Sequence, residues 1–379
     1  MSLASRNKLI NRLEVRLGRP RMFSKPVGVD VVLTKACNFA CTFCKDYETE
    51  GAKRISVENF ERMARQLMPT ASRLNFCSGG EPYLHTGLEE LLRIARRYNP
   101  DLYTWVLSNG SILRENRLRT ILEEDLITEH GFSVDGVRAA TVESIRINAK
   151  FDVIMKNIKM LLDLRRDLGK KRPSVTIRYA LMRSNIEELA DAVEMWGELG
   201  VERIDGGYVS LANGMDRDLS LFYHQDLARA CFEKARNVAS RYKHLTIRLP
   251  ALVSDEKHLV DNPDKCRFPW RFVMVDTNGQ ILPCYQAFEA LRFESIYDAD
   301  VSFDEIWNST KYQQLRSTVN NDSVPKFFPY CAQCETRYGS SREDPHLGDE
   351  SWAKALGEEW LPDGVHHKRP LKGTAAREP

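Results

Sequence analysis

The sequence has no apolar run that approaches the roughly 18 residues a membrane-spanning helix requires. Its N-terminal segment, Met1–Lys25, is basic and amphipathic, but it lacks the apolar core and the small-residue cleavage site of a signal peptide. These two absences predict a cytoplasmic protein. Thiols stay reduced in that compartment, so the nine cysteines are expected to serve metal or catalytic sites rather than disulfides.

The sequence also has little net charge, because 55 basic residues nearly balance 53 acidic ones and leave +2. A surface that binds nucleic acid or anionic lipid needs a basic face, and only short clusters such as Arg96-Arg97 and Arg165-Arg166 are found. Such clusters are typical of solvated helix faces. Neither a nucleic-acid partner nor a membrane partner is therefore expected.

Short β-rich runs alternate with longer helical patterns up to about residue 245. The strand candidates are Val27–Thr34, Arg73–Cys77, Tyr103–Ser108, Thr128–Val134, Ser174–Met182 and Arg203–Leu211. Six strand–helix units in series predict a parallel sheet with right-handed crossovers, two units short of a closed barrel. The expected fold class is therefore α/β, a partial (β/α)6 barrel with its active site at the carboxyl ends of the strands.

The composition divides the chain into four segments. We expect an N-terminal extension (1–26), the partial barrel (27–245), a small cysteine-ligated domain (246–340) and a polar C-terminal tail (341–379). The last boundary follows a shift to polar and charged residues after the final cysteine.

Three cysteines follow the first predicted strand directly. Cys37, Cys41 and Cys44 have the spacing CxxxCxxC. Three thiolates on a compact loop can bind three irons of a 4Fe–4S cube and leave the fourth iron without a protein ligand. A structural zinc site would use four ligands instead.

This motif resembles the signature of the radical S-adenosylmethionine superfamily, in which an aromatic residue such as Phe43 usually precedes the last cysteine. Further motifs of that superfamily occur in order at successive strand ends, over roughly Val27 to Leu211. The residues that the resemblance implies in cofactor binding are Phe43, Gly79, Gly80, Glu81, Pro82, Ser108, Asn109, Ser133, Asp135 and Arg178. Each lesser motif is weak alone, since a stray GGEP is an ordinary turn.

The resemblance assigns a part to each of these motifs. Gly79–Pro82 would receive the methionine amino group, Ser108-Asn109 and Ser133–Asp135 would contact ribose and carboxylate, and Arg178 would hold the methionine carboxylate. It also implies that the reduced cluster cleaves S-adenosylmethionine to a 5′-deoxyadenosyl radical, which removes a hydrogen atom from a substrate. The protein then has to orient the reactants and exclude water.

Four cysteines lie beyond the predicted barrel. Cys266 and Cys284 frame C-x12-Gly279-x4-C, and Cys331 and Cys334 form CxxC. Asp276–Gly279 predicts a hairpin turn between the flanking apolar runs. The set resembles the SPASM and twitch modules of the superfamily, without the later cysteines of a full SPASM module. Four cysteines suffice for one auxiliary 4Fe–4S cluster, and a structural zinc ribbon is the alternative that spacing permits.

Cys77 and Cys231 belong to neither set. Cys77, four residues before Glu81, is either a catalytic hydrogen-atom donor or a packed thiol, whereas Cys231 lies in a helical pattern typical of a core position. Other residues near strand ends could face a substrate: His85, Glu129, His130, Asp205 and Tyr208.

The predicted single auxiliary cluster resembles the 2-deoxy-scyllo-inosamine dehydrogenase type. The segment before the first strand (1–26) is too short for the leader-binding domain that many peptide-modifying members carry. The leading expectation is therefore radical oxidation or rearrangement of a polar, hydroxylated small molecule, served by a flavodoxin- or ferredoxin-type electron donor. The alternatives are a ribosomal-peptide maturase, a radical epimerase, or a non-enzymatic scaffold that would yield no 5′-deoxyadenosine.

Overall fold

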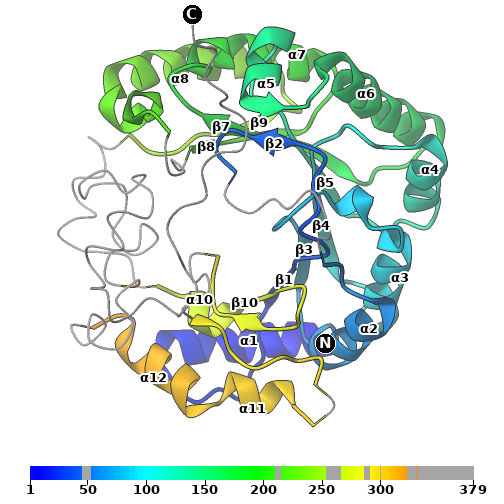
Figure 1. Ribbon diagram of the computed structural model, residues 1–379, viewed down its shortest axis with the longest axis vertical. Helices are drawn as coiled ribbons and strands as arrows, with labels where there is room; N and C mark the ends of the chain where they lie inside the picture. The colour runs from blue at the N-terminus through cyan, green and yellow to red at the C-terminus, as the bar shows by residue number, and fades with distance from the viewer. Residues whose placement is uncertain are drawn as a thin grey trace, which may run out of the picture.

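The computed structural model describes residues 1–44, 53–209, 215–252, 266–285, 291–298, 300–321 and residue 331. A curved sheet forms the inner layer, and helices cover its outer face (Figure 1). Over the described strands the sheet does not close on itself, because β9 and β11 are its two edges. The predicted partial α/β barrel is confirmed.

The main sheet has nine strands among the described residues, in the order β11-β10-β1-β3-β4-β5-β7-β8-β9. All neighbours are parallel except the pair β10–β11. The strands are β1 (Gly28–Val31), β3 (Arg73–Phe76), β4 (Tyr103–Ser108), β5 (Glu129–Ser133), β7 (Ser174–Leu181), β8 (Arg203–Tyr208), β9 (Thr246–Arg248), β10 (Phe272–Val275) and β11 (Ile281–Leu282). The six predicted strands are all present, in the predicted sequence.

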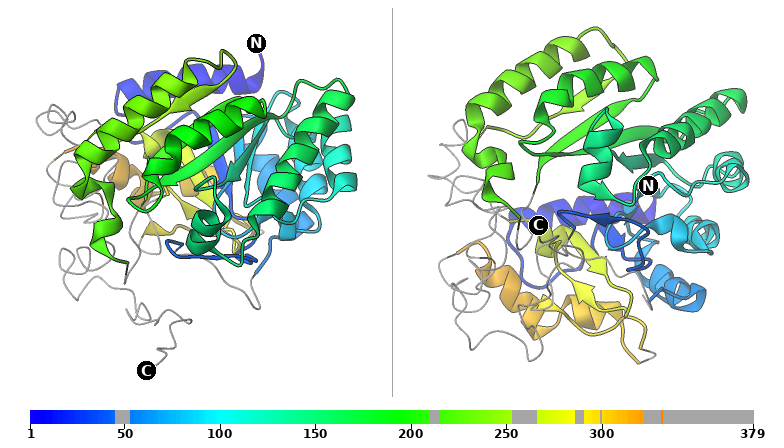
Figure 2. Two further views of the ribbon diagram at one scale, coloured as in Figure 1. Left: turned by 90° about the horizontal axis from the view of Figure 1, so that it is seen from above. Right: turned by 45° about the horizontal axis from the view of Figure 1, so that its top comes forward.

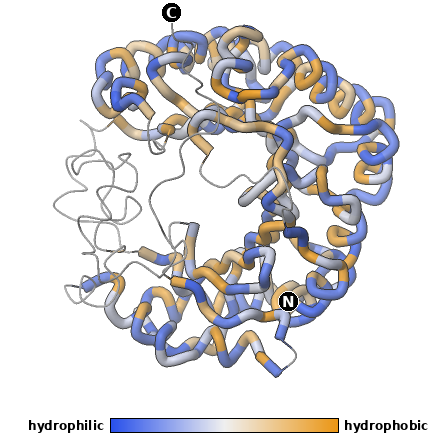
Figure 3. Tube along the Cα trace, in the orientation of Figure 1, coloured by the Kyte–Doolittle hydropathy of each residue, from blue (hydrophilic) through white to orange (hydrophobic). Residues whose placement is uncertain are grey.

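Helices follow the strands and bury their apolar faces against the sheet. The outer layer consists of α2 (Val57–Leu67), α3 (Leu88–Tyr98), α4 (Glu115–Glu123), α6 (Phe151–Asp167), α7 (Leu189–Glu198) and α8 (Gln225–Ala239). Phe60, Phe132, Trp196 and Phe232 are among the fully buried side chains of this core. Apolar and polar residues alternate along the helical layer, which gives each helix one face for the core and one for water (Figure 3).

Three strands, β9, β10 and β11, extend the sheet beyond the six units. β9 pairs with β8, so the parallel series continues one strand past residue 245. At the other end β10 pairs in parallel with β1, with Val273 opposite Val29, and brings the second cysteine region against the first strand. The predicted hairpin between β10 and β11 is confirmed, and Gly279 takes the positive φ of +82° that its turn requires.

The C-terminal helices pack against the beginning of the chain. They are α10 (Phe268–Arg271), α11 (Phe303–Trp307) and α12 (Thr310–Thr318). The Trp307 indole donates to the Ser24 carbonyl, and the Arg316 guanidinium donates to the Pro20 carbonyl. An N-terminal helix, α1 (Leu3–Arg16), lies beside α10. Within the described ranges, no helix is both long and apolar enough to cross a membrane.

Candidate active site

The loop of the first three cysteines leaves β1 at its carboxyl end. Within this cluster loop, β2 (Ala40–Cys41) pairs antiparallel with β6 (Arg146–Ile147), the short strand after α5 (Ala139–Ile145). The register places Cys41 opposite Arg146. A segment beyond β5 therefore holds the cluster loop against the barrel.

The three thiols lie near enough to interact electrostatically. Burial raises the pKa of the Cys41 thiol to about 11, Arg146 opposes this rise, and the nearby Cys37 and Cys44 thiols add to it. Burial likewise raises the pKa of Cys37. Among the described residues, no three His, Cys, Asp or Glu side chains gather closely enough to hold one metal ion. Three thiolates on one loop suit an iron–sulfur cluster, in which each thiolate binds its own iron.

Arg146 is the buried charge behind this loop. Its guanidinium contacts the Cys41 sulfur at 3.5 Å and the Asp135 carboxylate at 2.7 Å, and it stacks over the Phe43 ring. Asp135 itself is fully buried and also accepts the Ala180 backbone N–H. Asp135, expected beside the cofactor, thus makes its contacts within the protein. Arg146 belongs to no motif, and sequence reasoning missed it.

The Gly79–Pro82 turn at the end of β3 packs directly on the cluster loop. The Gly80 N–H donates to the Thr34 carbonyl and the Glu81 N–H donates to the Ala36 carbonyl, both at 2.8 Å. A Cβ added to Gly80 would overlap the Ala36 carbonyl oxygen. Only glycine permits this approach, so the turn and the loop are fitted to each other.

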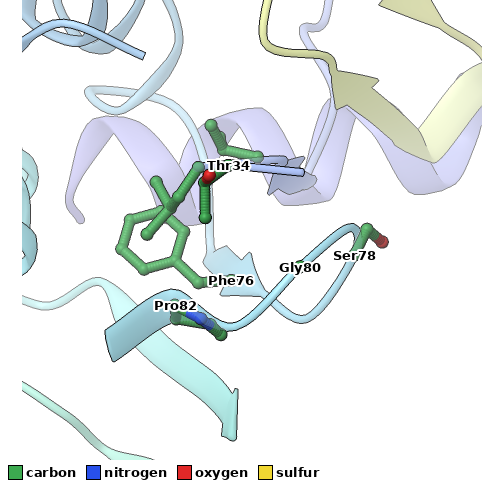
Figure 4. Close-up of a pocket in the computed structure, with 7 residues that line it drawn as sticks. Thr34, Phe76, Ser78, Gly80 and Pro82 are labelled. Carbon is green, nitrogen blue, oxygen red and sulfur yellow. The ribbon is translucent and has the colours of Figure 1, made fainter. Parts of the chain in front are cut away.

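Beneath this contact lies a narrow hollow, shown in Figure 4 with Thr34, Phe76, Ser78, Gly80 and Pro82 around it. It has no space of water size. It is therefore a packing seam between the ends of β1 and β3 and cannot admit a cofactor.

The Glu81 carboxylate links β3 to β4. One oxygen accepts the Ser108 hydroxyl at 2.8 Å and the other accepts the Asn109 backbone N–H at 2.7 Å. Burial raises the pKa of this carboxyl to about 7, although these hydrogen bonds oppose the rise. Glu81 thus fixes the loop after β4, and its oxygens are engaged within the protein.

Asn109 reaches from that loop to the cysteines. Its side-chain Nδ2 donates to the side-chain Oδ1 of Asn38 at 2.9 Å and lies 4.0 Å from the Cys37 sulfur. Gly79, Gly80, Glu81, Pro82, Ser108 and Asn109 therefore gather around the cluster loop.

The inner face of β5, β7 and β8 is charged. Ser133, Arg178 and Asp205 share one row across the three strands, and an Arg178 nitrogen lies 3.5 Å from an Asp205 oxygen. Below them the buried Glu129 accepts hydrogen bonds from Tyr103, Thr176 and Arg203. Arg178, with an exposed fraction of 43%, can meet a ligand, whereas Glu129 is a structural anchor.

Cys77 lies at the end of β3 with its thiol directed at a buried carboxylate. The Cys77 sulfur is 2.8 Å from an oxygen of Asp30 on β1, and Tyr285 and Ser78 also hydrogen-bond that carboxylate. Burial and the neighbouring Asp30 raise the pKa of the thiol well above its usual range. Asp30 and Tyr285 were not foreseen. Tyr285 directly follows Cys284, so this network joins the barrel to the second cysteine region.

Three of the four C-terminal cysteines are described. Cys266 precedes α10 and exchanges backbone hydrogen bonds with the Asn320 side chain, Cys284 follows β11, and Cys331 packs against the same core. Cys334 lies outside the described residues. The eight described cysteines form no disulfide. Cys231 is buried in the core on α8, as predicted.

The remaining candidates are divided between core and inner face. His130 is fully buried, where its ring packs on Phe132 and hydrogen-bonds the Tyr83 hydroxyl. His85 is buried and bonds the Ile55 carbonyl. Both serve structure. Tyr208 donates to the Ala251 carbonyl at the end of β8.

Models of two families match the chain. The Radical SAM superfamily matches residues 31–196, and the SPASM iron–sulfur cluster-binding domain matches residues 266–335. These ranges contain the cluster loop with its surrounding motifs and the four C-terminal cysteines, respectively.

Related proteins align with both of these regions of the chain. The chain is 22% identical over 344 residues to the antilisterial bacteriocin subtilosin biosynthesis protein AlbA of Bacillus subtilis, covering 88% of this chain and 72% of the relative. It is 24% identical over 337 residues to the PqqA peptide cyclase of Gluconobacter oxydans, covering 84% and 86%.

Solved structures share the fold. Streptococcus suis SuiB bound to S-adenosylmethionine matches with a TM-score of 0.63 at 16% identity, over 82% of this chain and 72% of that one. The enzyme anSMEcpe with bound AdoMet matches with a TM-score of 0.61 at 17% identity, over 85% and 90%. This protein is a radical S-adenosylmethionine enzyme. Its C-terminal region is a SPASM domain, which places the chain among the radical enzymes with auxiliary iron–sulfur binding.

Proposed function

We propose that the enzyme modifies a peptide by radical chemistry. The observation that supports this best is that its curated relatives align across both the barrel and the SPASM domain, and that their names describe bacteriocin biosynthesis and peptide cyclisation. A structure of Streptococcus suis SuiB contains its precursor peptide, SuiA. The peptide alternative is thus better supported than the sugar-like small molecule favoured by sequence.

The residues around the cluster loop suit the radical-generating cofactor. Cys37, Cys41 and Cys44 would hold a 4Fe–4S cluster, and Ser108, Asn109, Ser133 and Arg178 would line the S-adenosylmethionine beside it. When bound, the cluster and S-adenosylmethionine together supply the radical that removes a hydrogen atom from the substrate. The Gly80 and Glu81 contacts hold the loops in register, and Asp135 acts through Arg146.

One auxiliary cluster would be held by Cys266, Cys284, Cys331 and Cys334. The antiparallel β11 brings Cys284, two residues after it, level with the amino end of β1. An oxidative modification needs an acceptor for the second electron, and a cluster here would be connected to the barrel through the hydrogen bond between Tyr285 and Asp30. A flavodoxin- or ferredoxin-type protein would serve as the external donor.

Cys77 bears on the type of reaction. Its thiol is held at one position by Asp30 rather than packed loosely, which suits a hydrogen-atom donor as an epimerase requires. Product made in deuterated water would then carry deuterium at the altered carbon, and Cys77→Ala would abolish its formation. If the product lacks deuterium and Cys77→Ala is still active, the Cys77 thiol has a structural role and is not a hydrogen-atom donor.

The peptide proposal is tested with the anaerobically reconstituted enzyme, S-adenosylmethionine and dithionite. The first probe is any short peptide found to be encoded beside the enzyme's gene, with an aminocyclitol as the matched small molecule. We expect 5′-deoxyadenosine formation to rise with the peptide and the peptide mass to change. Stimulation by the aminocyclitol alone would contradict the proposal.

A further inference from the structure

The N-terminal helix α1 packs on the rest of the protein through polar side chains. Asn7 donates to the carbonyls of Lys25 and Thr70, and Asn11 donates to the Trp270 carbonyl at 2.6 Å. The Glu14 carboxylate accepts the backbone N–H groups of Phe23 and Ser24. These three polar residues are the buried residues of the helix. Most of its large apolar side chains are left on the outside.

The outer surface of residues 1–23 is the main apolar surface of the described chain. Nine large hydrophobic residues are exposed among the described residues, and six of them lie here. They are Met1 (89%), Leu3 (64%), Leu9 (52%), Leu13 (54%), Leu17 (73%) and Phe23 (78%). Three of the leucines recur every four residues, so they follow one line along the helix. We call these six residues the α1 apolar line.

The segment that carries the α1 apolar line is also basic. Six basic residues share the segment: Arg6, Lys8, Arg12, Arg16, Arg19 and Arg21. In the described part of the chain none of the six forms an ion pair. The one acidic residue of Met1–Lys25 is Glu14, which is buried and turned inward. The exposed surface of this segment therefore combines large apolar side chains with positive charge.

We propose that the α1 apolar line docks on an anionic phospholipid surface. Such a surface offers negative headgroups above acyl chains, so arginines can stay with the headgroups while leucines and Phe23 enter below them. A second copy would present the same basic residues and be repelled.

The position of α1 suits this contact. Its partners precede β1, β3 and β10, so the helix lies at the amino ends of the strands, whereas the cluster loop and the glycine turn follow their carboxyl ends. Figure 2 (left) shows α1 along the upper edge of the molecule. A molecule docked through α1 would keep its active-site mouth directed into water.

The test uses the full-length reconstituted enzyme and sedimentation with vesicles. One set contains phosphatidylcholine alone and the other equal parts of phosphatidylcholine and phosphatidylglycerol. We expect binding to the anionic vesicles, weakened about tenfold or more by Leu9→Gln/Leu13→Gln/Leu17→Gln and by Arg12→Glu/Arg16→Glu, and weakened by added salt. The matched control, Val153→Gln/Lys156→Glu/Lys159→Glu on the exposed side of α6, should bind like the unaltered chain.

Hydrogen exchange of the unaltered protein gives a second readout that requires no variant. Anionic vesicles should slow amide exchange in residues 1–23 and leave α6 unchanged. Protein that stays in the supernatant with anionic vesicles would overturn the proposal. The proposal would also be overturned if amide exchange in residues 1–23 slowed with rising protein concentration and not with added lipid, because a second copy would then cover the surface.

Discussion

Arg146 is held 2.7 Å from Asp135, and from that position its guanidinium also reaches the sulfur of Cys41. Both members of the pair are buried, with exposed fractions of 9% and 0% for the two side chains. The pair joins the end of β5 to the cluster loop. A buried and compensated charge is therefore placed next to the expected ligands of the radical-generating cluster.

Removing one member of this pair should cost more than removing both. Arg146→Met leaves the buried Asp135 carboxylate without its charged partner, which should lower the free energy of unfolding by about 3–5 kcal/mol. Arg146→Met combined with Asp135→Asn should recover much of that loss. Urea unfolding of the three proteins measures the difference, and equal losses in the single and double variants would contradict the pairing.

Gly80→Ala should disrupt the contact between the glycine turn and the cluster loop. The new methyl group would overlap the Ala36 carbonyl oxygen, so the two loops must separate. We expect a loss of about 1–3 kcal/mol and lower iron retention after reconstitution. Gly207→Ala is the control, because a Cβ at Gly207 has no atom within 4 Å. Iron retention equal to that of Gly207→Ala would argue against a fitted contact.

Asp30 should make the stability depend on pH. Burial raises the pKa of its carboxyl from 3.8 to about 6 in the folded chain. The protonated form is thus favoured by folding, so the stabilisation is complete below pH 3.8 and is lost as the pH rises towards 6. This amounts to about 3 kcal/mol.

Asp30→Asn has no such titration. The difference in melting temperature between Asp30→Asn and the unaltered chain should therefore grow in favour of the variant from pH 4 to pH 6 and then level off. A difference that stays constant over this range would show that Asp30 titrates as it does in the unfolded chain.

The cysteines predict the iron content. Two 4Fe–4S clusters correspond to about eight iron and eight sulfide per chain, and replacing Cys37, Cys41 and Cys44 together by alanine should leave about half. Metal analysis after anaerobic reconstitution provides the measurement. About four iron with one zinc would identify the C-terminal site as a ribbon, and about twelve iron would require a further cluster.

The sequence was sufficient for the local parts of this structure. The six strands of the barrel carry their own β-rich patterns, and Cys37, Cys41 and Cys44 are recognisable by their spacing. Pairings between distant segments were not predictable. β10 pairs with β1 although the whole strand–helix series lies between them, and no periodicity links the two. Arg146 and Asp30 are buried charges whose partners lie in segments distant in the sequence, so their importance emerges only when the strands are aligned.

Helix α1 shows a second limit of sequence reasoning. Its amphipathic pattern was recognised, and the usual rule would turn Leu9 and Leu13 towards the core. The structure turns Asn7, Asn11 and Glu14 inward instead, because they hydrogen-bond backbone groups of the loops before β1 and β3 and of helix α10. Which face of this amphipathic helix is buried therefore depends on backbone groups, far away in the sequence, that need hydrogen-bond partners.

The pairing of β10 with β1 has a consequence for synthesis of the chain. A ribosome releases β1 early, while the strand Phe272–Val275 emerges only after the whole α/β series has been made. Until then β1 presents an unpaired edge, the kind of edge that invites association between chains. The β1 edge, which is prone to aggregation, thus stays exposed for most of the elongation time. It is covered once the SPASM segment has been synthesised and β10 can pair with β1.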